Sequence, residues 1–445
     1  MQVTSIDKGI RILDIDWYTT PECRYIQNYG PLIIKIIDRI KVLKSRRLSL
    51  KGKALVLNTL VLSKLWYIAA VLPLFTHSEN TPHPTHPVNY LTEINNIIKD
   101  YLWNRNPEAP PPLSREILQK PRNSGGLGLL NVARQSIALR AKQWNQVLDQ
   151  TTQESPGTRL ARYFLANRVN ALPTCTRIAF LSRHGETVPP INRHRGPFLN
   201  VNKGYRDIAD VIRNHPTLIE NPAVQVTCKL AYKKLCSRDT ATVRGDERWA
   251  SLGYSLPAWQ NGWQALNINF HQDILWKVRH IILNRYYERN VQRTLEVPSA
   301  NCKYCMDRSR SIVFDTHIHS LYHCPQAQRA WEQIHPIIDK ANVPTQRNHL
   351  VIGIPGKNNK SKIVNTIVIA TLYKIWRARY EYKYNKKIIP HTAVVRDAIK
   401  EVKKAIDRHL NVYVRKDAVR DFETSVMVPE LFTLNEHKTA IVYYF

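Results

Sequence analysis

The segments Cys302-Lys-Tyr-Cys305 and His319-Ser-Leu-Tyr-His-Cys324 carry three of the seven cysteines in a chain of 445 residues. Their spacing is C-x2-C-x13-H-x4-C. Two thiolates on a tight turn can point at one metal ion about 2.3 Å from each sulfur, and a second pair of ligands returned by the chain completes a tetrahedron. Soft and borderline ligands of this kind favour zinc over calcium or magnesium. The sequence therefore predicts one closed, structural zinc site per chain, held by Cys302, Cys305, His319 and Cys324.

Three histidines could supply the fourth ligand, because His317 and His323 flank His319. His323 adjoins Cys324, which makes joint ligation awkward, whereas His319 leaves a spacing that one turn of helix or a tight loop can close. Two other interpretations are cysteines that lie near each other by chance and a redox role for the C-x2-C pair. The redox interpretation lacks a βαβ context and leaves His319 and Cys324 unexplained. The remaining cysteines show no metal-ligand spacing, so we expect buried thiols at Cys23, Cys175, Cys228 and Cys236.

On both sides of the cysteine cluster, apolar residues recur every three or four positions, as in amphipathic helices. The clearest helical patterns lie in residues 32–47, 274–287, 363–387 and 394–410. The glycines at 125, 126 and 128 match no phosphate-binding motif, and they indicate a tight turn. We therefore expect a mainly α, multi-domain helical chain with a small zinc-stabilised CCHC module.

Composition changes along the chain suggest four regions. We expect a helical region at 1–150, a linker or poorly defined region at 151–262, the zinc module at 263–340, and a basic helical region at 341–445. Residues 54–75 are long and apolar enough to resemble a membrane span, but Asn58 and Lys64 lie near the middle. We interpret this stretch as a buried helix, and we expect no membrane partner.

The strongest compositional signal is charge. Lys and Arg number 65 against 35 Asp and Glu, which leaves a formal net charge of +30. Such an excess favours a polyanionic partner, most simply nucleic acid bound through its phosphates with little base specificity. For any single basic residue the alternative is a solvated helix face. Tyr380, Tyr382 and Tyr384 interleave with part of the basic set and could stack on unpaired bases. The candidate nucleic-acid contacts are Arg46, Arg47, Lys51, Lys53, Arg377, Arg379, Lys383, Lys386 and Lys387.

Several segments together resemble the non-LTR (LINE-type) retrotransposon reverse transcriptases. Residues 48–67, LSLKGKALVLNTLVLSKLWY, and 125–132, GGLGLLNV, resemble the stretches that follow the polymerase core in that family. Trp276, the cysteine cluster and Trp331 resemble its zinc-binding module, and residues 375–379, IWRAR, resemble the helix after it. The resemblance implies thumb-like helices and a zinc module that bind RNA template, target DNA or both, beside a polymerase core supplied separately. It also implies a nuclear location.

The sequence lacks the paired aspartates that the family's polymerase uses to copy a template. The family's polymerase holds two metal ions on paired aspartates, and the sequence contains no Asp-Asp pair. We therefore expect no polymerase activity from this chain alone, and we assign no catalytic residue. The alternatives are a stand-alone metal-dependent nuclease built from dispersed carboxylates, and a non-catalytic structural or protein-binding role. The N-terminal segment lacks a signal-peptide pattern, so we expect a reducing intracellular compartment.

Overall fold

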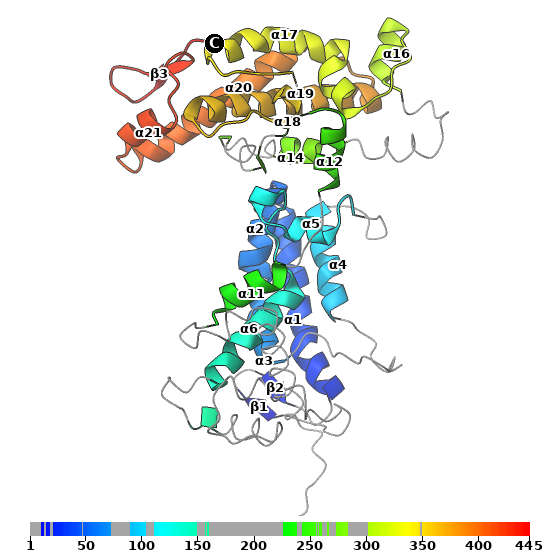
Figure 1. Ribbon diagram of the computed structural model, residues 1–445, viewed down its shortest axis with the longest axis vertical. Coiled ribbons are helices and arrows are strands. Elements are labelled where there is room, and N and C mark those ends of the chain that lie inside the picture. The colour runs from blue at the N-terminus through cyan, green and yellow to red at the C-terminus, as the bar shows by residue number, and fades with distance from the viewer. Residues whose placement is uncertain are drawn as a thin grey trace, which may run out of the picture. The chain divides into compact units, whose positions relative to one another are not determined.

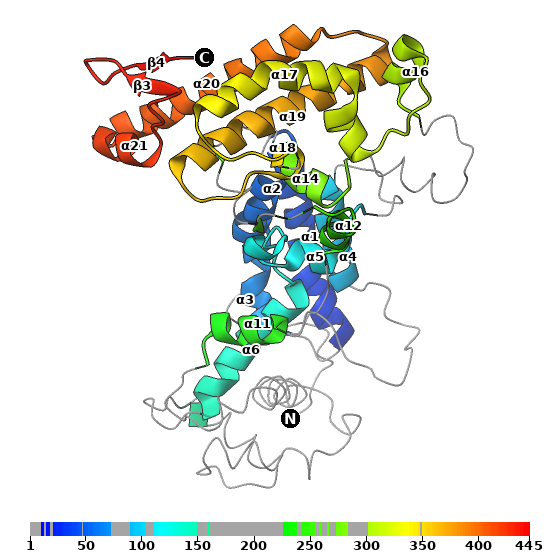
Figure 2. The same cartoon turned by 45° about the horizontal axis from the view of Figure 1, so that its top comes forward.

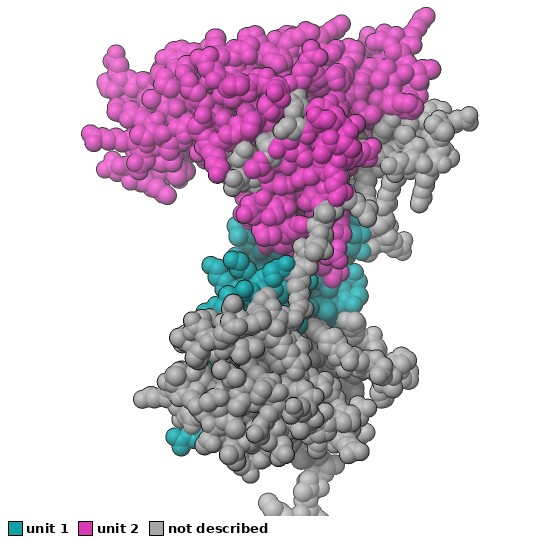
Figure 3. All heavy atoms as spheres, viewed as in Figure 1, with its two compact units in different colours: residues 1–46, 53–111, 129–240 teal, residues 47–52, 112–128, 241–445 magenta. Residues whose placement is uncertain are grey.

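The computed structural model shows a mainly α protein that divides into two compact units (Figure 3). Unit 1 comprises residues 1–46, 53–111 and 129–240, and unit 2 comprises residues 47–52, 112–128 and 241–445. The structure describes residues 10–12, 15–17, 21–46, 48–72, 90–103, 111–148, 156, 158–159, 226–237, 243–254, 256, 258–259, 265–266, 273–283, 301–347 and 349–445.

Unit 1 is built mainly from helices, with one short antiparallel hairpin in which Ile10 pairs with Trp17 (Figure 1). The α1 helix packs against α3 and α4, while α6 packs against α3 and α11. The described elements of unit 1 are β1 (Ile10–Ile12), β2 (Ile15–Trp17), α1 (Pro21–Lys44), η1 (Leu57–Val61), α3 (Ser63–Val71), α4 (Tyr90–Trp103), α6 (Val132–Leu148) and α11 (Cys228–Cys236). The α2 helix (Leu50–Val56) contains the division between the units.

The amphipathic helix predicted at residues 32–47 is confirmed as the second half of α1. Ile33 and Ile40 are buried, whereas Lys35 and Arg39 on the opposite face are exposed. The helix begins earlier than the apolar pattern indicates, at Pro21. Proline is tolerated in the first turn of a helix because its missing N–H would have no partner there.

The described part of the apolar stretch predicted at residues 54–75, residues 54–72, forms a bent pair of helices instead of one straight helix. Helical residues Leu50–Val61 and Ser63–Val71 meet at 47°, after a π-helical turn in which the amide of Leu62 donates to the carbonyl of Leu57. Asn58 accepts a hydrogen bond from the amide of Leu130 at 3.0 Å. Among the described residues, no single helix has the length and apolar composition of a membrane span, although this bent pair meets both criteria together.

Unit 2 contains the cysteine cluster and one continuous hydrophobic core. Its elements are α5 (Arg115–Gln119), η2 (Arg122–Ser124), α12 (Arg244–Ser251), α14 (Asp273–Arg279), α16 (Lys303–Ser309), η7 (His319–His323), α17 (Pro325–Lys340), α18 (His349–Ile352), α19 (Asn359–Asn385), α20 (His391–Val414), α21 (Val419–Ser425), β3 (Phe432–Leu434) and β4 (Ile441–Tyr443). The last two strands form an antiparallel hairpin.

The α19 helix is the centre of unit 2. It packs against α17, α20, α14 and α18, and Figures 1 and 2 both show α17 and α20 running alongside it. Apolar side chains are buried around most of its first half, from Ile363 to Leu372. The helices predicted at 363–387 and 394–410 are thus confirmed as α19 and α20. The predicted stripe of α20 faces the core, with Val402, Ile406 and Leu410 buried.

Gly125, Gly126 and Gly128 form the predicted tight turn. Gly125 and Gly128 adopt positive φ angles of 86° and 68°, which glycine tolerates without steric cost. The amides of Gly126 and Gly128 donate to the carbonyls of Pro121 and Lys120, at 3.1 and 2.9 Å. A Cβ atom on Gly126 would lie 1.9 Å from the Lys120 carbonyl oxygen, so only glycine allows this close approach.

The helix predicted at residues 274–287 is confirmed up to Arg279 and is wrong for residues 280–283, whereas residues 284–287 lie outside the described part of the chain. The α14 helix ends at Arg279, and Ile281 has a positive φ of 55°. The chain turns here because Trp276 Nε1 and His280 Nε2 both donate to the carbonyl of Gly125, at 2.9 and 2.8 Å. Arg279, the last residue of the helix, is buried.

The two compact units follow other boundaries than the four predicted regions. Residues 263–340 and 341–445 belong to the same unit, where α17 from the first range packs against α19 and α20 from the second. Residues 112–128 also belong to that unit. Most of residues 151–262 lie outside the described part of the chain, so the predicted linker stays a prediction.

Candidate metal centre

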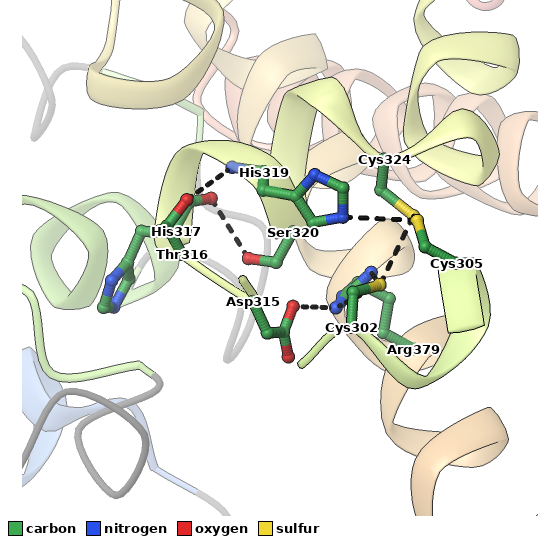
Figure 4. A network of polar contacts seen from close by, with 9 residues as sticks. All are labelled: Cys302, Cys305, Asp315, Thr316, His317, His319, Ser320, Cys324 and Arg379. Carbon is green, nitrogen blue, oxygen red and sulfur yellow. Dashed lines mark hydrogen bonds and ion pairs between the residues drawn. The ribbon is translucent and has the colours of Figure 1, made fainter. Parts of the chain in front are cut away.

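The four predicted ligands come from three local structures that meet at one point (Figure 4). Cys302 immediately precedes α16, and Cys305 lies in the first turn of that helix. His319 begins the π-helical turn η7, and Cys324 follows it as the residue before α17. The sequence folds this way because Cys324 is followed by Pro325, which favours the first position of a helix.

Backbone and side-chain hydrogen bonds hold these segments in place. The amide of Cys302 donates to the carbonyl of Val313 at 2.8 Å, which joins the start of the cysteine turn to the chain that leads toward His319. Thr316 Oγ1 accepts from the amide of His319 at 3.0 Å. Buried Trp331 donates through Nε1 to the carbonyl of Leu321 at 2.8 Å and so fixes the π-helical turn to α17.

The ligand atoms have the separations of a tetrahedral metal site. All four lie within 4.8 Å of one another and all four residues are buried. Cys324 Sγ is 4.0 Å from the sulfurs of both Cys302 and Cys305, and Cys305 Sγ is 3.4 Å from His319 Nε2. Tetrahedral bonds of ordinary zinc length would place two sulfurs roughly 3.8 Å apart and a sulfur and a nitrogen roughly 3.6 Å apart. The cluster could therefore hold a metal ion.

The geometry selects one histidine from the three candidates. His319 directs Nε2 toward Cys305 Sγ, whereas Figure 4 shows the His317 ring turned away from the sulfurs. The carbonyl of His317 accepts from Ser320 Oγ at 3.0 Å. His323 stacks edge-on against Tyr322, with ring centroids 5.2 Å apart. His319 is therefore the histidine that completes the cluster.

Arg379, which is predicted from the sequence as a nucleic-acid contact, lies against the cluster. Its terminal nitrogens are 3.5 and 3.6 Å from Cys302 Sγ, and it forms an ion pair with Asp315. The side chains of Arg379 and Asp315 are only 13% and 11% exposed. Burial alone would lower the pKa of Arg379, but Asp315 and Cys302 outweigh it and raise that pKa. Its positive charge is thus held beside the thiols.

The short distances between the three sulfurs shift the pKa values of the cysteines. A hydrogen bond from the Cys324 thiol and the charge of Arg379 lower the pKa of Cys302, although burial opposes the shift. The same hydrogen bond, together with burial, raises the pKa of Cys324. Metal binding requires all three sulfurs as thiolates, and so it releases protons. Three thiolates around a divalent ion carry a net charge of −1, and the Arg379–Asp315 ion pair lies beside them.

Of the four predicted nucleic-acid contacts near the start of α2, the three that the structure describes differ in exposure and in their neighbours. Arg46 is exposed, and Arg47 lies outside the described residues. Burial, and secondarily the charge of Arg122, lower the pKa of half-buried Lys51. Lys53 donates through Nζ to the carbonyls of Tyr101 and Leu102, at 3.0 and 3.1 Å. Of these four candidates, Arg46 has the most exposed described side chain.

The basic end of α19 is more open. Lys383, Lys386 and Lys387 are exposed, and exposed Arg377 pairs with Glu381 at 2.8 Å. Tyr382, which the sequence pattern groups with the stacking tyrosines, is buried and donates to Asp307 at 2.8 Å. Lys303 is a further basic residue at this surface that the predicted set does not include. A side-chain hydrogen bond with Lys386 lowers its pKa. Its place in the sequence, directly after Cys302, could have indicated that it lies beside the cluster.

No protein-family model matches the chain, and no curated protein matches it in sequence. The function therefore has to be argued from the cluster and from the charged and aromatic side chains around it.

Proposed function

We propose that the cluster holds one structural zinc ion. Three thiolates and one imidazole form a donor set that zinc prefers, and the separations fit its tetrahedral geometry. Four protein ligands leave no position open for water or substrate, and the ligands are buried. Such an ion joins α16, the π-helical turn and α17, and its binding energy contributes to folding. His319, Cys302, Cys305 and Cys324 would be its ligands.

We also propose that the chain is a nucleic-acid-binding part of a LINE-type reverse transcriptase, without a polymerase core of its own. The observation that carries this proposal is the basic surface beside the cluster, where Lys303, Lys383 and Lys386 gather in a chain of net charge +30. Like charges held together on a surface suit phosphate binding. The partners would be RNA template, target DNA or both, and the resemblance described above implies a nuclear location and a separately supplied polymerase core.

The zinc assignment can be tested by elemental analysis of the purified protein. We expect about one zinc per chain, lost in the double variant Cys302→Ser/Cys305→Ser. A matched control is Cys228→Ser/Cys236→Ser, which removes two free cysteines from a separate helix. The control should keep its zinc. Metal retained by the first double variant would contradict the assignment.

Nucleic-acid binding can be tested by titrating labelled oligonucleotides at several salt concentrations. We expect the logarithm of the association constant to fall linearly with the logarithm of salt concentration, because phosphate contacts release counterions. Binding that is absent, or insensitive to salt, would argue for a structural or protein-binding role instead. Magnesium-dependent primer extension by the pure chain would contradict the proposed lack of a polymerase core, and metal-dependent cleavage would favour a nuclease.

A further inference from the structure

A groove of about 170 Å³ lies beside the cluster in unit 2. One wall comes from the turn that begins at the first cysteine ligand, and the other comes from the C-terminal half of α19. Arg379 and Asp315, the ion pair that contacts the cluster, also line it. The groove is smaller than the roughly 300–1,000 Å³ typical of sites that enclose a drug-sized ligand. The side chains used below are Lys303, Tyr304, Trp376, Tyr380, Lys383 and Tyr384.

The α19 wall is a row of aromatic rings. Trp376, Tyr380 and Tyr384 are four residues apart and therefore share one helix face. The ring centroids of Trp376 and Tyr380 are 6.0 Å apart, and those of Tyr380 and Tyr384 are 4.6 Å apart. Tyr380 and Tyr384 are 41% and 63% exposed, an unusual position for large rings whose apolar faces favour burial.

Positive charge accompanies the rings. The Arg377 guanidinium lies 5.6 Å from the centroid of Tyr380, and the Lys383 ammonium lies 5.8 Å from that of Tyr384. Lys303 faces the same groove from the opposite wall. The acidic member of the lining, Asp315, is paired with Arg379. A ligand in this groove thus meets exposed aromatic faces flanked by cations.

We propose that this groove binds an unpaired nucleotide of a single-stranded nucleic acid. The base stacks on Tyr380 and Tyr384, and Lys303 and Lys383 contact the phosphates beside it. Stacking on aromatic side chains within a basic groove is the common way to bind single strands without reading sequence. In a duplex the base faces are already stacked on one another, so exposed rings would add nothing. The inference rests on the proposed nucleic-acid binding and deepens it.

The metal cluster supports one wall of this groove. Lys303 and Tyr304 lie between the ligands Cys302 and Cys305, so they keep their positions only while the turn is held. The Tyr304 ring meets the buried Tyr382 ring edge-on at 5.4 Å, which joins the turn to α19. The groove therefore couples metal binding to nucleic-acid binding.

The test is fluorescence anisotropy with the zinc-loaded full chain and a labelled single-stranded RNA of about ten nucleotides, within the usual range of single-strand site sizes. Tyr384→Leu should weaken binding about tenfold, as the loss of one stacked base predicts. Tyr384→Phe keeps the ring and should bind like the parent protein. Tyr444→Leu removes another exposed tyrosine, 47% accessible and outside the groove lining, and should change nothing. A duplex of the same length should be insensitive to Tyr384→Leu.

The salt dependence separates stacking from charge. Tyr384→Leu should leave the slope against salt concentration unchanged, whereas Lys383→Gln should reduce it by about one. If the parent protein binds single strands in a salt-dependent manner but Tyr380→Leu and Tyr384→Leu bind equally well, the groove proposal is wrong and the proposed function stands. If the parent protein binds no nucleic acid, both fail. Circular dichroism and zinc content show whether each variant is folded.

Discussion

Arg379 points both terminal nitrogens of its guanidinium at the sulfur of Cys302, at 3.5 and 3.6 Å, while it pairs with Asp315. The interaction connects the C-terminal half of the longest described helix, α19, to the cysteine turn, 77 residues earlier in the chain. Groups outside the ligand shell orient metal ligands and tune their charge. Arg379 is therefore part of the structure around the cysteine cluster.

Replacing Arg379 with leucine should destabilise unit 2. The variant leaves the buried carboxylate of Asp315 without its partner, and breaking a buried ion pair in this way costs about 3–5 kcal/mol. Chemical unfolding followed by circular dichroism measures the loss. Arg377→Leu is the matched control, because this arginine is two residues away, exposed and paired at the surface. It should cost less than about 1 kcal/mol.

The double variant Arg379→Leu/Asp315→Leu should recover part of the stability lost in the single one, since no charge then stays buried without a partner. Equal stability of Arg379→Leu and Arg377→Leu would show that the buried pair does not have the structural role described here.

Gly125→Ala should destabilise the protein more than Gly253→Ala. Both glycines have positive φ angles, 86° and 80°, and alanine in this conformation costs about 1–2 kcal/mol. A Cβ atom on Gly125 would lie 2.7 Å from the ring of Trp259, whereas a Cβ atom on Gly253 would meet nothing within 4 Å. The clash should add about 1–3 kcal/mol. Urea unfolding of the two variants compares them, and equal losses would contradict the close packing at Gly125.

His280 should make the protein less stable in acid. Burial lowers its pKa to about 4, although the Gly125 carbonyl that it contacts opposes the shift. Since an unfolded histidine has a pKa of about 6.5, the unfolded state binds more protons between these values. The stabilisation is complete above about pH 6.5 and decreases as the pH falls toward 4, by on the order of 3 kcal/mol.

The measurement is the free energy of unfolding at pH 7 and pH 5, for the parent protein and for His280→Gln. The variant should lose less stability on acidification than the parent. The comparison between the two proteins removes the contributions of all other titrating groups, which both proteins share. An identical pH dependence in both proteins would mean that His280 is not buried in its neutral form.

Local patterns in the sequence were sufficient for part of this structure. The ligands Cys302, Cys305, His319 and Cys324 are predictable because their spacing reflects a turn and a short return of the chain. The α19 and α20 helices are predictable because their apolar residues repeat every three or four positions over many turns. In both cases the structure follows from residues that are close together in the sequence or that repeat at a regular spacing.

Features that depend on distant contacts were missed. Arg379 resembles any basic helix residue until Asp315, 64 residues away, is seen to face it. The α14 helix ends early because its last turn binds the carbonyl of Gly125, more than 150 residues away. Tyr382 is buried by Tyr304 and Asp307, which no pattern within α19 reveals. Each of these residues follows a local pattern that a tertiary contact overrides.

If both proposals hold, the metal-bound cluster keeps the nucleic-acid-binding surface in place. The affinity of the protein for a single-stranded oligonucleotide can be measured before zinc removal by a chelator, after removal, and after zinc is restored. The metal content is measured at each stage. We expect the affinity to fall by at least tenfold when zinc is removed and to return with the metal. Unchanged affinity in protein shown to contain no metal would contradict the claim.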